Sequence, residues 1–516
     1  MADARPAEPL VVALDVGTSA VKAVLVDGAG AVLASASAPL RVDAPRPGWA
    51  EQDPAAWWAG ALAALAALGA RAPAGALARA VAVGLSGQMH SSVFLDRAGA
   101  VIRPALLWCD GRTTAECAEV TAAVGGEAGL RDLVANPALE GFTLPKVLWL
   151  RRHEPAAYAR LATVLLPKDY LRYRLTGALA TEPSDASGTL MYDVAGGRWS
   201  EGLLGAVGVP AALLPSLGGS VEVLGRVTAE AAARTGLRAG TPVVGGGADN
   251  ACGAAGVGAV APGAAVASWG TSGTVLATTA EPLVDPGLRA HTFAHVAPGG
   301  WYVMGVVLSA GGAFAWYRDQ LARDVADAPD ADARLDAEAA SVAPGADGVT
   351  FLPYLQGERT PHRDAALRGA FFGLSLAHTR AHVTRAVLEG VAFAMRDALG
   401  VLRGLGLAGG GPGDAPLLLT GGGARSAFLQ QLQADVYGAP VAAAGRDEGP
   451  AYGAALLALV GAGAYADLGA AAGAAFADAG RDVAARPAPD ARAAYDAAYA
   501  RFRALAARAG PAGAID

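Results

Sequence analysis

Asp249 is the residue whose surroundings point most directly to chemistry. It is the only charged side chain between Arg238 and Glu281, and three glycines and an alanine precede it. Burying a carboxylate without a partner costs roughly several kcal/mol or raises its pKa. A carboxyl group with a raised pKa at the rim of a cleft is suited to take a proton from an alcohol. Asp249 is therefore a candidate general base, and a helix N-cap is the alternative, because a helix could begin at Ala251.

Two Gly-Thr-Ser turns, at residues 17–19 and 270–272, have the composition of a phosphate-binding loop. Glycine lets the backbone approach an anion, successive N–H groups point at phosphate oxygens, and the hydroxyls add donors. For one copy alone, an ordinary hairpin turn is the better explanation. Two copies that face each other from two lobes would hold a polyphosphate between them.

Asp15 ends an apolar run two residues before the first turn. A carboxylate beside a phosphate site is repulsive unless a cation intervenes, so Mg²⁺ bound with the nucleotide is expected at Asp15. The alternative is a turn-forming aspartate that caps backbone N–H groups.

Polar groups that could bind a polyol or a nucleoside follow other predicted strands. Asn250, one of two asparagines in the chain, stands beside Asp249, and its amide can both donate to and accept from hydroxyls. His90 ends a buried strand and could donate to a sugar hydroxyl, although a structural histidine is the alternative. A glycine-rich turn at 421–423 precedes a predicted helix and could pass close to a nucleobase or ribose.

The elements that must position these residues alternate between strand and helix patterns, which indicates an α/β fold with largely buried sheets. The predicted strands are 10–15, 20–26, 31–36, 81–85 and 417–420, and the predicted helices are 54–70, 113–124, 323–341 and 379–402. The two turns lie 253 residues apart (270 minus 17), about half the chain. This spacing predicts two lobes of similar design, residues 8–255 and 256–485, with a glycine-rich linker at 409–413 in the second and a helical tail, 486–516, after it.

The composition excludes several classes of protein. With 53% hydrophobic and 17% charged residues, the 516-residue chain cannot be disordered throughout. A net charge of -7 gives no basic footprint for nucleic acid or an anionic membrane. The uncharged stretch 299–317 is interrupted by two glycines and is expected to be a strand, a turn and a helix start rather than a membrane span. Three cysteines and a very short apolar segment near the N-terminus indicate a cytoplasmic protein without a signal peptide.

Only three of the 40 basic residues are lysine: Lys22, Lys146 and Lys168. Because the chain otherwise uses arginine, each of these positions is expected to need a compact ammonium group in a tight space, as a packing or ion-pair constraint.

Together the motifs resemble a known family. Residues 15–22, the second Gly-Thr-Ser turn and the late Gly-Gly-Gly-Ala-Arg-Ser resemble the phosphate-1, phosphate-2 and adenosine elements of the actin-like, hexokinase-like ATPase superfamily. Residues 141–153 and 369–389 resemble the two diagnostic signatures of the FGGY carbohydrate kinases. Further stretches resemble the bacterial xylulokinases of that family, namely residues 49–58, 86–90, 165–171, 184–188 and 352–362.

The resemblance implies a two-lobed, actin-like fold of duplicated ribonuclease H-like domains with a cleft between the lobes. It implies phosphorylation of D-xylulose by ATP with Mg²⁺, with Asp249 as the general base and Asp15 serving the metal. The ketose would lie against Met89, His90, Asp249 and Asn250. The residues implied along the ATP path are Thr18, Ser19, Thr271, Gly311, Gly422 and Ala424.

Two residues depart from the family pattern. Ala248 stands directly before the base, where the family usually has glycine, and a positive φ there would add strain of about 1 kcal/mol and lower turnover. Trp269 stands before the second turn, where leucine is often found, and is expected to alter how ATP packs.

Two alternatives stay open at this point. Another FGGY kinase, acting on ribulose, gluconate or glycerol, is the near one, although glycerol kinases resemble an Arg-Glu pair where this chain has Met89-His90. A non-kinase actin-like ATPase is the distant one. The expected partners are small molecules, a ketose and ATP, without nucleic acid or membrane, and a homodimer is one assembly that this allows.

Overall fold

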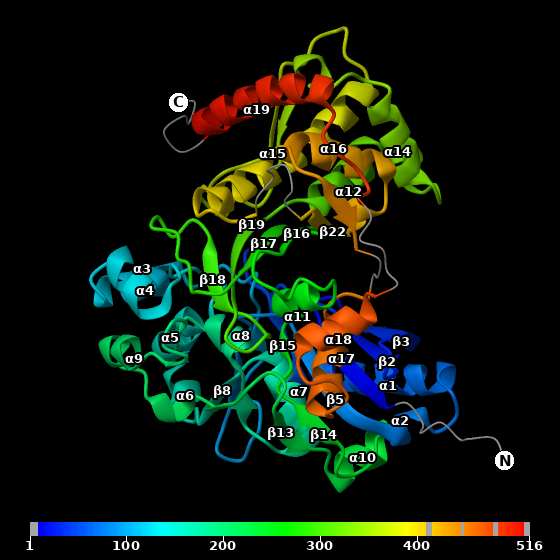
Figure 1. Cartoon of the computed structure of the whole chain (residues 1–516). Coiled ribbons are helices and arrows are strands. Elements are labelled where there is room, and N and C mark those ends of the chain that lie inside the picture. Colours follow the sequence, from blue (N-terminus) through cyan, green and yellow to red (C-terminus); the bar gives the residue numbers. More distant parts are fainter. Residues whose placement is uncertain (1–8, 409–414, 445–447, 478–482, 510–516) are drawn as a thin grey trace, which may run out of the picture.

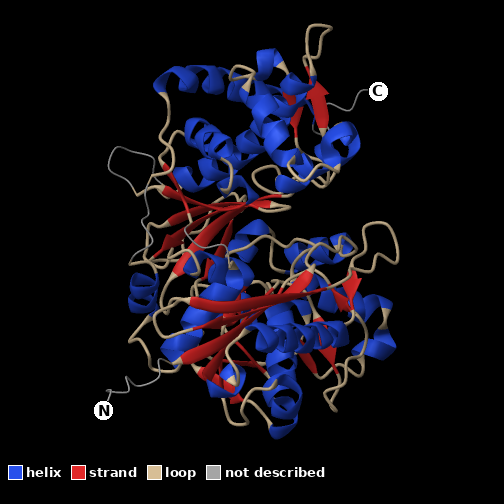
Figure 2. Ribbon diagram, turned by 90° about the vertical axis from the view of Figure 1, so that its right-hand side faces the viewer, coloured by secondary structure: helices blue, strands red, loops and turns tan. Residues whose placement is uncertain are grey.

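The computed structural model describes residues 9–408, 415–444, 448–477 and 483–509 and shows two lobes, each built on a mixed β-sheet flanked by helices (Figure 1, Figure 2). The predicted linker at 409–413 lies outside the described residues. The first sheet runs in the order β13 (Val223–Arg226), β14 (Pro242–Val244), β5 (Ala80–Gly87), β1 (Leu10–Val16), β2 (Ala20–Val26), β3 (Val32–Pro39), with β15 (Gly247–Ala248) also paired to β5. The second runs β18 (His291–Ala294), β19 (Trp301–Val307), β17 (Gly273–Thr279), β16 (Ala265–Trp269), β22 (Leu417–Gly421), β23 (Val441–Ala443).

The two sheets repeat one local arrangement. In each, a Gly-Thr-Ser turn joins an antiparallel pair, β1 with β2 and β16 with β17. In each, the first strand of that pair has a parallel neighbour, β5 or β22. A third antiparallel strand, β3 or β19, lies on the other side. The duplication inferred from two short motifs is therefore present in the strand order.

Strand β1 shows why the first sheet is buried on both faces. Val12 and Leu14 belong to the cluster that includes Trp57 of α1 (Pro54–Arg71), whereas Val11 and Ala13 belong to the cluster on the opposite face. This alternation follows from the two-residue period of a strand. Helix α1 starts where predicted, because the Asp53 side chain accepts a hydrogen bond from Ala55 N (2.9 Å) and proline occupies the first turn.

The late part of the chain returns to the first lobe. Helix α17 (Pro450–Gly461) packs on β1 and β5 so closely that a Cβ at Gly84 would lie 1.9 Å from Ala454 O. Tyr452 Oη donates to Gly30 O (2.6 Å), and Tyr465 Oη donates to Gly28 O (2.6 Å). Figure 1 shows α17 and α18 (Leu468–Ala475) beside the first three strands, and α19 (Pro489–Ala509) back on the second lobe. A segment that the sequence division grouped with the second lobe thus contributes to the core of the first.

The other elements follow the predicted alternation. In the first lobe they are α2 (Ala76–Arg79), α3 (Thr114–Ala123), α4 (Glu127–Val134), α5 (Thr143–His153), α6 (Pro155–Tyr158), α7 (Pro167–Thr176), α8 (Pro183–Ser187), α9 (Glu201–Val207), α10 (Ala229–Thr235), α11 (Asp249–Ala255) and short strands β4 (Glu51–Gln52), β6 (Val93–Leu95), β7 (Ala105–Leu106), β8 (Thr163–Leu165), β9 (Ala180–Thr181), β10 (Tyr192–Asp193), β11 (Arg198–Trp199) and β12 (Ser216–Leu217). In the second they are α12 (Gly311–Leu321), α13 (Arg323–Ala326), α14 (Ala331–Ala340), β20 (Thr350–Leu352), β21 (Ala370–Phe372), α15 (Arg380–Gly404) and α16 (Ala427–Tyr437).

Two element predictions can be judged directly. The single helix predicted over 323–341 is wrong: Pro329 separates α13 from α14, because proline lacks the N–H that a continuous helix requires. The uncharged stretch 299–317 is strand β19 followed by the start of α12, as predicted. None of the described helices combines the length and apolarity needed to span a bilayer.

Candidate active site

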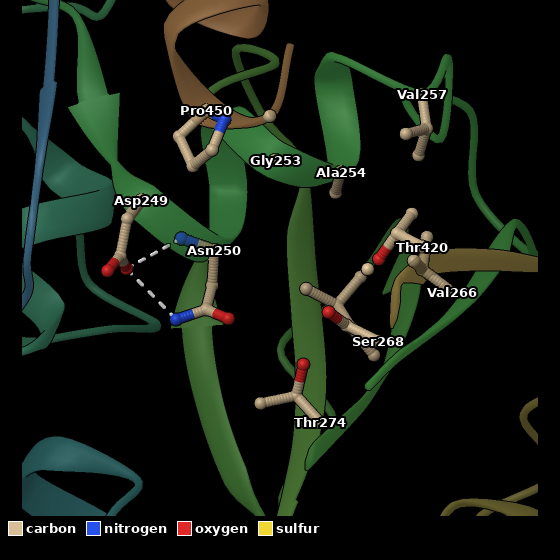
Figure 3. Close-up of a pocket in the computed structure, with 13 residues that line it drawn as sticks. Asp249, Asn250, Gly253, Ala254, Val257, Val266, Ser268, Thr274, Thr420 and Pro450 are labelled. Atoms are coloured by element: carbon tan, nitrogen blue, oxygen red, sulfur yellow. Dashed lines mark hydrogen bonds between the residues drawn. The ribbon is translucent and has the colours of Figure 1, made fainter. Parts of the chain in front are cut away.

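Asp249 is the first residue of helix α11, directly after β15. Its Oδ1 accepts hydrogen bonds from Asn250 N (2.7 Å) and Asn250 Nδ2 (2.9 Å) (Figure 3). Burial and, to a smaller extent, the charge of nearby Asp15 raise the pKa of Asp249 to about 7, although the two hydrogen bonds from Asn250 lower it. The N-cap is Ala248, so the alternative of Asp249 as the cap does not hold. The residue is a carboxyl group poised to exchange a proton near neutral pH.

Ala248, the departure before the base, carries no backbone strain. Its φ is −56°, within the range that any L-residue adopts, so the positive φ and the strain expected there are absent, and the expected effect on turnover loses its basis. The positive φ falls two residues earlier, at Gly246 (69°), where a Cβ would lie 1.9 Å from Leu85 O. Glycine is needed at that position because the backbone passes directly over β5.

Asp15 lies at the end of β1, opposite Lys22 on β2 and Ser86 on β5. Burial raises its pKa to about 6, although the neighbouring Ser86 hydroxyl and the charge of Lys22 lower it. Its buried Oδ1 has no hydrogen-bond partner among the described residues, so the backbone-capping alternative has no support. A carboxylate oxygen without a donor, close to a second carboxylate, fits a hard divalent cation such as Mg²⁺.

No group of three or more His, Cys, Asp and Glu side chains within the described ranges could hold a metal by itself. A Mg²⁺ ion here would therefore take one or two carboxylate oxygens and complete its shell with nucleotide oxygens and water, which is the usual pattern for this ion.

The first Gly-Thr-Ser turn is tied into the first lobe through Thr18. Its Oγ1 accepts from Trp108 Nε1 (2.9 Å) and donates to Gln88 Oε1 (3.3 Å), and its carbonyl accepts from Gln52 Nε2 (2.8 Å). Ser19 is exposed at the tip of the turn. The Thr18 hydroxyl is thus fully engaged, and what this turn offers an anion is its backbone and Ser19.

The second Gly-Thr-Ser turn is fastened to the start of helix α12. Gly311 N donates to Gly270 O (2.8 Å), and Gly312 N donates to Thr271 O (2.9 Å). A Cβ at Gly311 would lie 2.6 Å from Gly270 O, so only glycine permits this approach. The side chain of Thr271 is exposed and free to meet a ligand.

Trp269 lies beneath the glycine-rich turn at 421–423 rather than at the surface of the site. It is 4% exposed, its Nε1 donates to Tyr437 Oη (2.9 Å), and a Cβ at Gly423 would lie 2.9 Å from its side chain. After Gly421 (φ 72°), residues Gly422–Ala424 form one turn of 3₁₀-helix. Trp269 therefore supports the backbone of the proposed adenosine element.

A cavity of about 290 Å³ lies between helix α11, which begins at Asp249, and the strands β16, β17 and β22 (Figure 3). Its lining includes Asp249 and Asn250 on one side and the hydroxyl side chains of Ser268, Thr274 and Thr420 on the other. Ser268 pairs with both of the others, so the three hydroxyls form a row across β17, β16 and β22. The sequence reasoning missed this row. The signal available was strand alternation beside the second turn, which places these positions on the face away from Trp269.

Met89 and His90 approach from the end of β5. Met89 Sδ lies 3.7 Å from Asn250 Nδ2 and 3.9 Å from Tyr302 Oη, so the methionine contacts the proposed polyol site. The His90 ring lies against those of Phe142 and Phe293, with the ring planes tilted to each other by 54° and 53°.

The protonation of His90 follows from its surroundings. Burial lowers its pKa to about 3, so the ring is neutral near pH 7. Its Nδ1 lies 2.6 Å from Gly188 O and must carry the proton, which leaves Nε2 as an acceptor. In this tautomer Nε2 has no proton to donate, so His90 could meet a sugar hydroxyl only as an acceptor, the reverse of the expected direction.

The backbone of His90 has a positive φ of 66°, a strained conformation that Thr143 and Lys146 hold in place. Thr143 Oγ1 (2.9 Å) and Lys146 Nζ (3.1 Å) both donate to His90 O, and the ammonium also donates to Gly141 O (2.5 Å). Lys22 forms an ion pair with Glu448 (2.6 Å). The rare lysines thus occupy tight polar positions, in agreement with the packing and ion-pair constraint inferred for them.

Comparison with known proteins agrees with this geometry. The model of the FGGY family of carbohydrate kinases, N-terminal domain, matches residues 10–256, and that of the C-terminal domain matches residues 265–462. The xylulose kinase of Escherichia coli (strain K12) is 40% identical over 450 residues, 87% of this chain and 89% of that protein. The xylulose kinase of Bacillus subtilis (strain 168) is 38% identical over 459 residues, 89% of each. The crystal structure of xylulose kinase from Rhodospirillum rubrum superposes with a TM-score of 0.85 at 35% identity, covering 98% of this chain and 99% of that one.

Proposed function

We propose that this chain, which belongs to the FGGY family of carbohydrate kinases, transfers the γ-phosphoryl group of ATP to the C5 hydroxyl of D-xylulose. One observation supports this most strongly: a partly buried carboxyl group, Asp249, whose pKa is raised to about 7, faces a cavity between the two lobes beside Asn250. The choice of sugar rests on the relatives, several of which are xylulose kinases.

The residues divide between two ligands. Met89, His90, Asp249 and Asn250 surround the proposed ketose position. ATP would lie along the two Gly-Thr-Ser turns, with Thr18 and Ser19 on the first lobe and Thr271 on the second. The nucleoside end would follow Gly311, Gly422 and Ala424. Asp15 would hold Mg²⁺, which when bound neutralises phosphate charge and orients the γ-phosphate.

Proton transfer is the step that the chain itself performs. Asp249 Oδ1 is occupied by two hydrogen bonds from Asn250, so Oδ2 is the oxygen that takes the proton of the attacking hydroxyl. His90 Nε2 accepts a hydrogen bond from another hydroxyl of the sugar and fixes its orientation. Because an activated ATP would otherwise react with water, binding of the sugar must exclude water from Asp249.

The other sugar specificities of the family are less favoured, and each predicts a different preferred substrate. A panel of D-xylulose, D-ribulose, gluconate and glycerol, assayed by coupled detection of ADP, separates them. We expect the highest kcat/KM with D-xylulose. A higher value with any other member of the panel would replace xylulose in the proposal.

Asp249→Asn tests the catalytic role. We expect kcat to fall by about 10²- to 10⁴-fold, because the amide cannot accept the proton. The Kd for ATP, measured by calorimetry, should remain within about twofold. An active Asn variant would remove Asp249 from the mechanism.

The proposal also places the protein in the cytoplasm, supported by three free cysteines. A homodimer stays a prediction, and light scattering of the purified chain measures it.

A further inference from the structure

Behind the cavity lies a group of five charged side chains that the mechanism does not use. Each has no exposed surface: Lys168, Asp169, Arg172, Glu182 and Asp185. Lys168 Nζ lies 2.7 Å from Asp169 Oδ1, 3.1 Å from Asp185 Oδ2 and 3.4 Å from Glu182 Oε1. An ammonium is a compact group with three donors, so it can meet three carboxyl groups arranged around a point, whereas a guanidinium is larger and directs its donors within one plane. Burial raises the pKa of Asp185 well above its ordinary value, so the group need not carry three negative charges.

Such a group is expensive to bury. Taking several charges out of water is often no better for stability than a well-packed apolar cluster of the same volume. A buried ionic network is therefore better understood by what it holds in place than by the stability it adds, and its hydrogen bonds lead to the segment that carries Asp249.

The first path starts at Glu182. Its carboxylate accepts hydrogen bonds from Ser184 N (2.8 Å), Asp185 N (2.9 Å), Ser184 Oγ (2.8 Å) and Ser220 Oγ (2.9 Å). The proton of the Ser184 hydroxyl is thereby committed to Glu182. The lone pairs of Ser184 Oγ are left to accept from Ala248 N, at 2.9 Å. Ala248 directly precedes Asp249, so this bond fixes the Gly247–Ala248 peptide, one residue before the base.

The second path starts at Arg172. Its guanidinium donates to Asp169 Oδ1 (2.8 Å), to Ala180 O (2.5 Å) and to Gly245 O. Gly245 opens the three-glycine run that directly precedes Ala248. The segment 245–248 is therefore held at both ends by the same buried network, although glycine would otherwise leave it the most mobile part of the backbone near the base.

We propose that Glu182 and Ser184 are positioning residues, which fix the direction of Asp249 through the Ala248 amide. This inference rests on the proposed role of Asp249. It explains why a fully buried ionic network stands directly behind the cavity, and why lysine was kept at residue 168.

The chain offers a matched pair of variants. Ser184 and Ser220 are both buried and both donate to Glu182, but the Ser184 hydroxyl also accepts from Ala248 N. Ser220 meets the same segment through its backbone, since Ser220 O accepts from Gly246 N (2.8 Å), and the change to alanine leaves that bond in place. We expect Ser184→Ala to lower kcat by about tenfold or more, since small misplacement of a catalytic group is costly. KM for D-xylulose and for ATP should stay within about twofold. Ser220→Ala should leave kcat within about twofold. It should lower Tm by about as much as Ser184→Ala does.

Equal loss of kcat in the two variants, or an unchanged kcat in Ser184→Ala, would overturn the positioning role. If Ser184→Ala does not fold, Ser184→Cys retains a weak acceptor of similar size and should lower kcat to an intermediate degree; a kcat equal to that of the unaltered chain would count against the proposal. Failure of the proposed function is distinct, because it would show as an active Asp249→Asn variant or as no turnover of D-xylulose by the unaltered chain.

Discussion

The two Gly-Thr-Ser turns have the same three residues but different structures. In the first hairpin Val16 pairs with Val21, which leaves four residues in the loop, whereas in the second Trp269 pairs with Gly273, which leaves three. Gly17 N accordingly donates to Ala20 O, whereas Gly270 N donates to Ser272 O, both at 3.0 Å.

The shorter loop depends on what packs behind it. A Cβ at Gly273 would lie 2.3 Å from Met395 Sδ on α15, so a larger residue at the start of this strand would require the Met395 side chain to move. In the first hairpin Ala20 stands at the corresponding position, and the strands pair one residue later, at Val21. A shared tripeptide thus predicts a turn, and the residue that follows it decides the length.

The position two residues before each turn separates the lobes chemically. It is Asp15 in the first and Ser268 in the second, so the first lobe has a carboxylate where the second has a neutral hydroxyl, and of these two side chains Ser268 is the one that lines the cavity. With Asp249 also on the first lobe, both carboxyl groups of the site lie on one side. The difference indicates that the first lobe supplies proton and metal chemistry and that the second supplies neutral donors to phosphate.

The largest expected effect comes from substituting Asp15 and Ser268 one at a time. Asp15→Asn should lower kcat by about 10²-fold or more, because it removes the carboxylate proposed for Mg²⁺. Ser268→Ala, the matched change in the second lobe, should lower kcat by less than about tenfold. Steady-state kinetics at saturating Mg²⁺ measures both. Equal losses would mean that the two lobes do not differ in this way.

The fall in kcat/KM at low pH should depend on the carboxyl group of the first lobe and not on the hydroxyl group of the second. Because burial raises the pKa of Asp249 to about 7 and the base must be ionised, kcat/KM should fall about tenfold per unit of pH below that value. Ser268→Ala should retain the same acidic limb. A profile that is flat between about pH 5 and 8 would contradict the assignment of Asp249 as the base.

The smallest effect should distinguish the two threonines. Thr18→Ala leaves the indole N–H of Trp108 without its acceptor and should lower the free energy of unfolding by about 1–3 kcal/mol. Thr271→Ala, at an exposed side chain, should change it by less than about 0.5 kcal/mol and raise KM for ATP instead. Urea unfolding and ATP kinetics together test this. A stability loss at Thr271 as large as at Thr18 would remove the contrast.

Much of the fold could be predicted from local patterns. The strands at 10–15 and 20–26 and the helix at 54–70 lie within a residue or two of the observed elements, because period-two apolar runs and the Asp-Pro start of α1 are local signals. The helix predicted over 323–341 is wrong, although Pro329, which separates α13 from α14, is also a local signal. The return of α17 to the first sheet could not be read from the sequence, since an apolar helix does not specify which sheet it covers.

The site residues likewise divide into those that the sequence revealed and those that only strand pairing brings together. Asp249, Asp15 and Asn250 could be found because an isolated charge or a rare amide stands out against small apolar neighbours. The hydroxyl row of Ser268, Thr274 and Thr420 could not, because serine and threonine are ordinary in strands and only the pairing of β16 with β17 and β22 aligns them.

The sequence by itself determined the duplicated Gly-Thr-Ser hairpins, the carboxylates beside them and the resemblance to the family, since residue type and spacing are local properties of the chain. Only the tertiary structure decided the φ of Ala248, the tautomer of His90 and the buried support of the base. Each of these depends on atoms from distant segments: Ser184 for the Ala248 amide, Gly188 for the imidazole and Lys168 for the carboxylates behind them. Contacts of this kind arise only when the chain has folded and water has been excluded from around them.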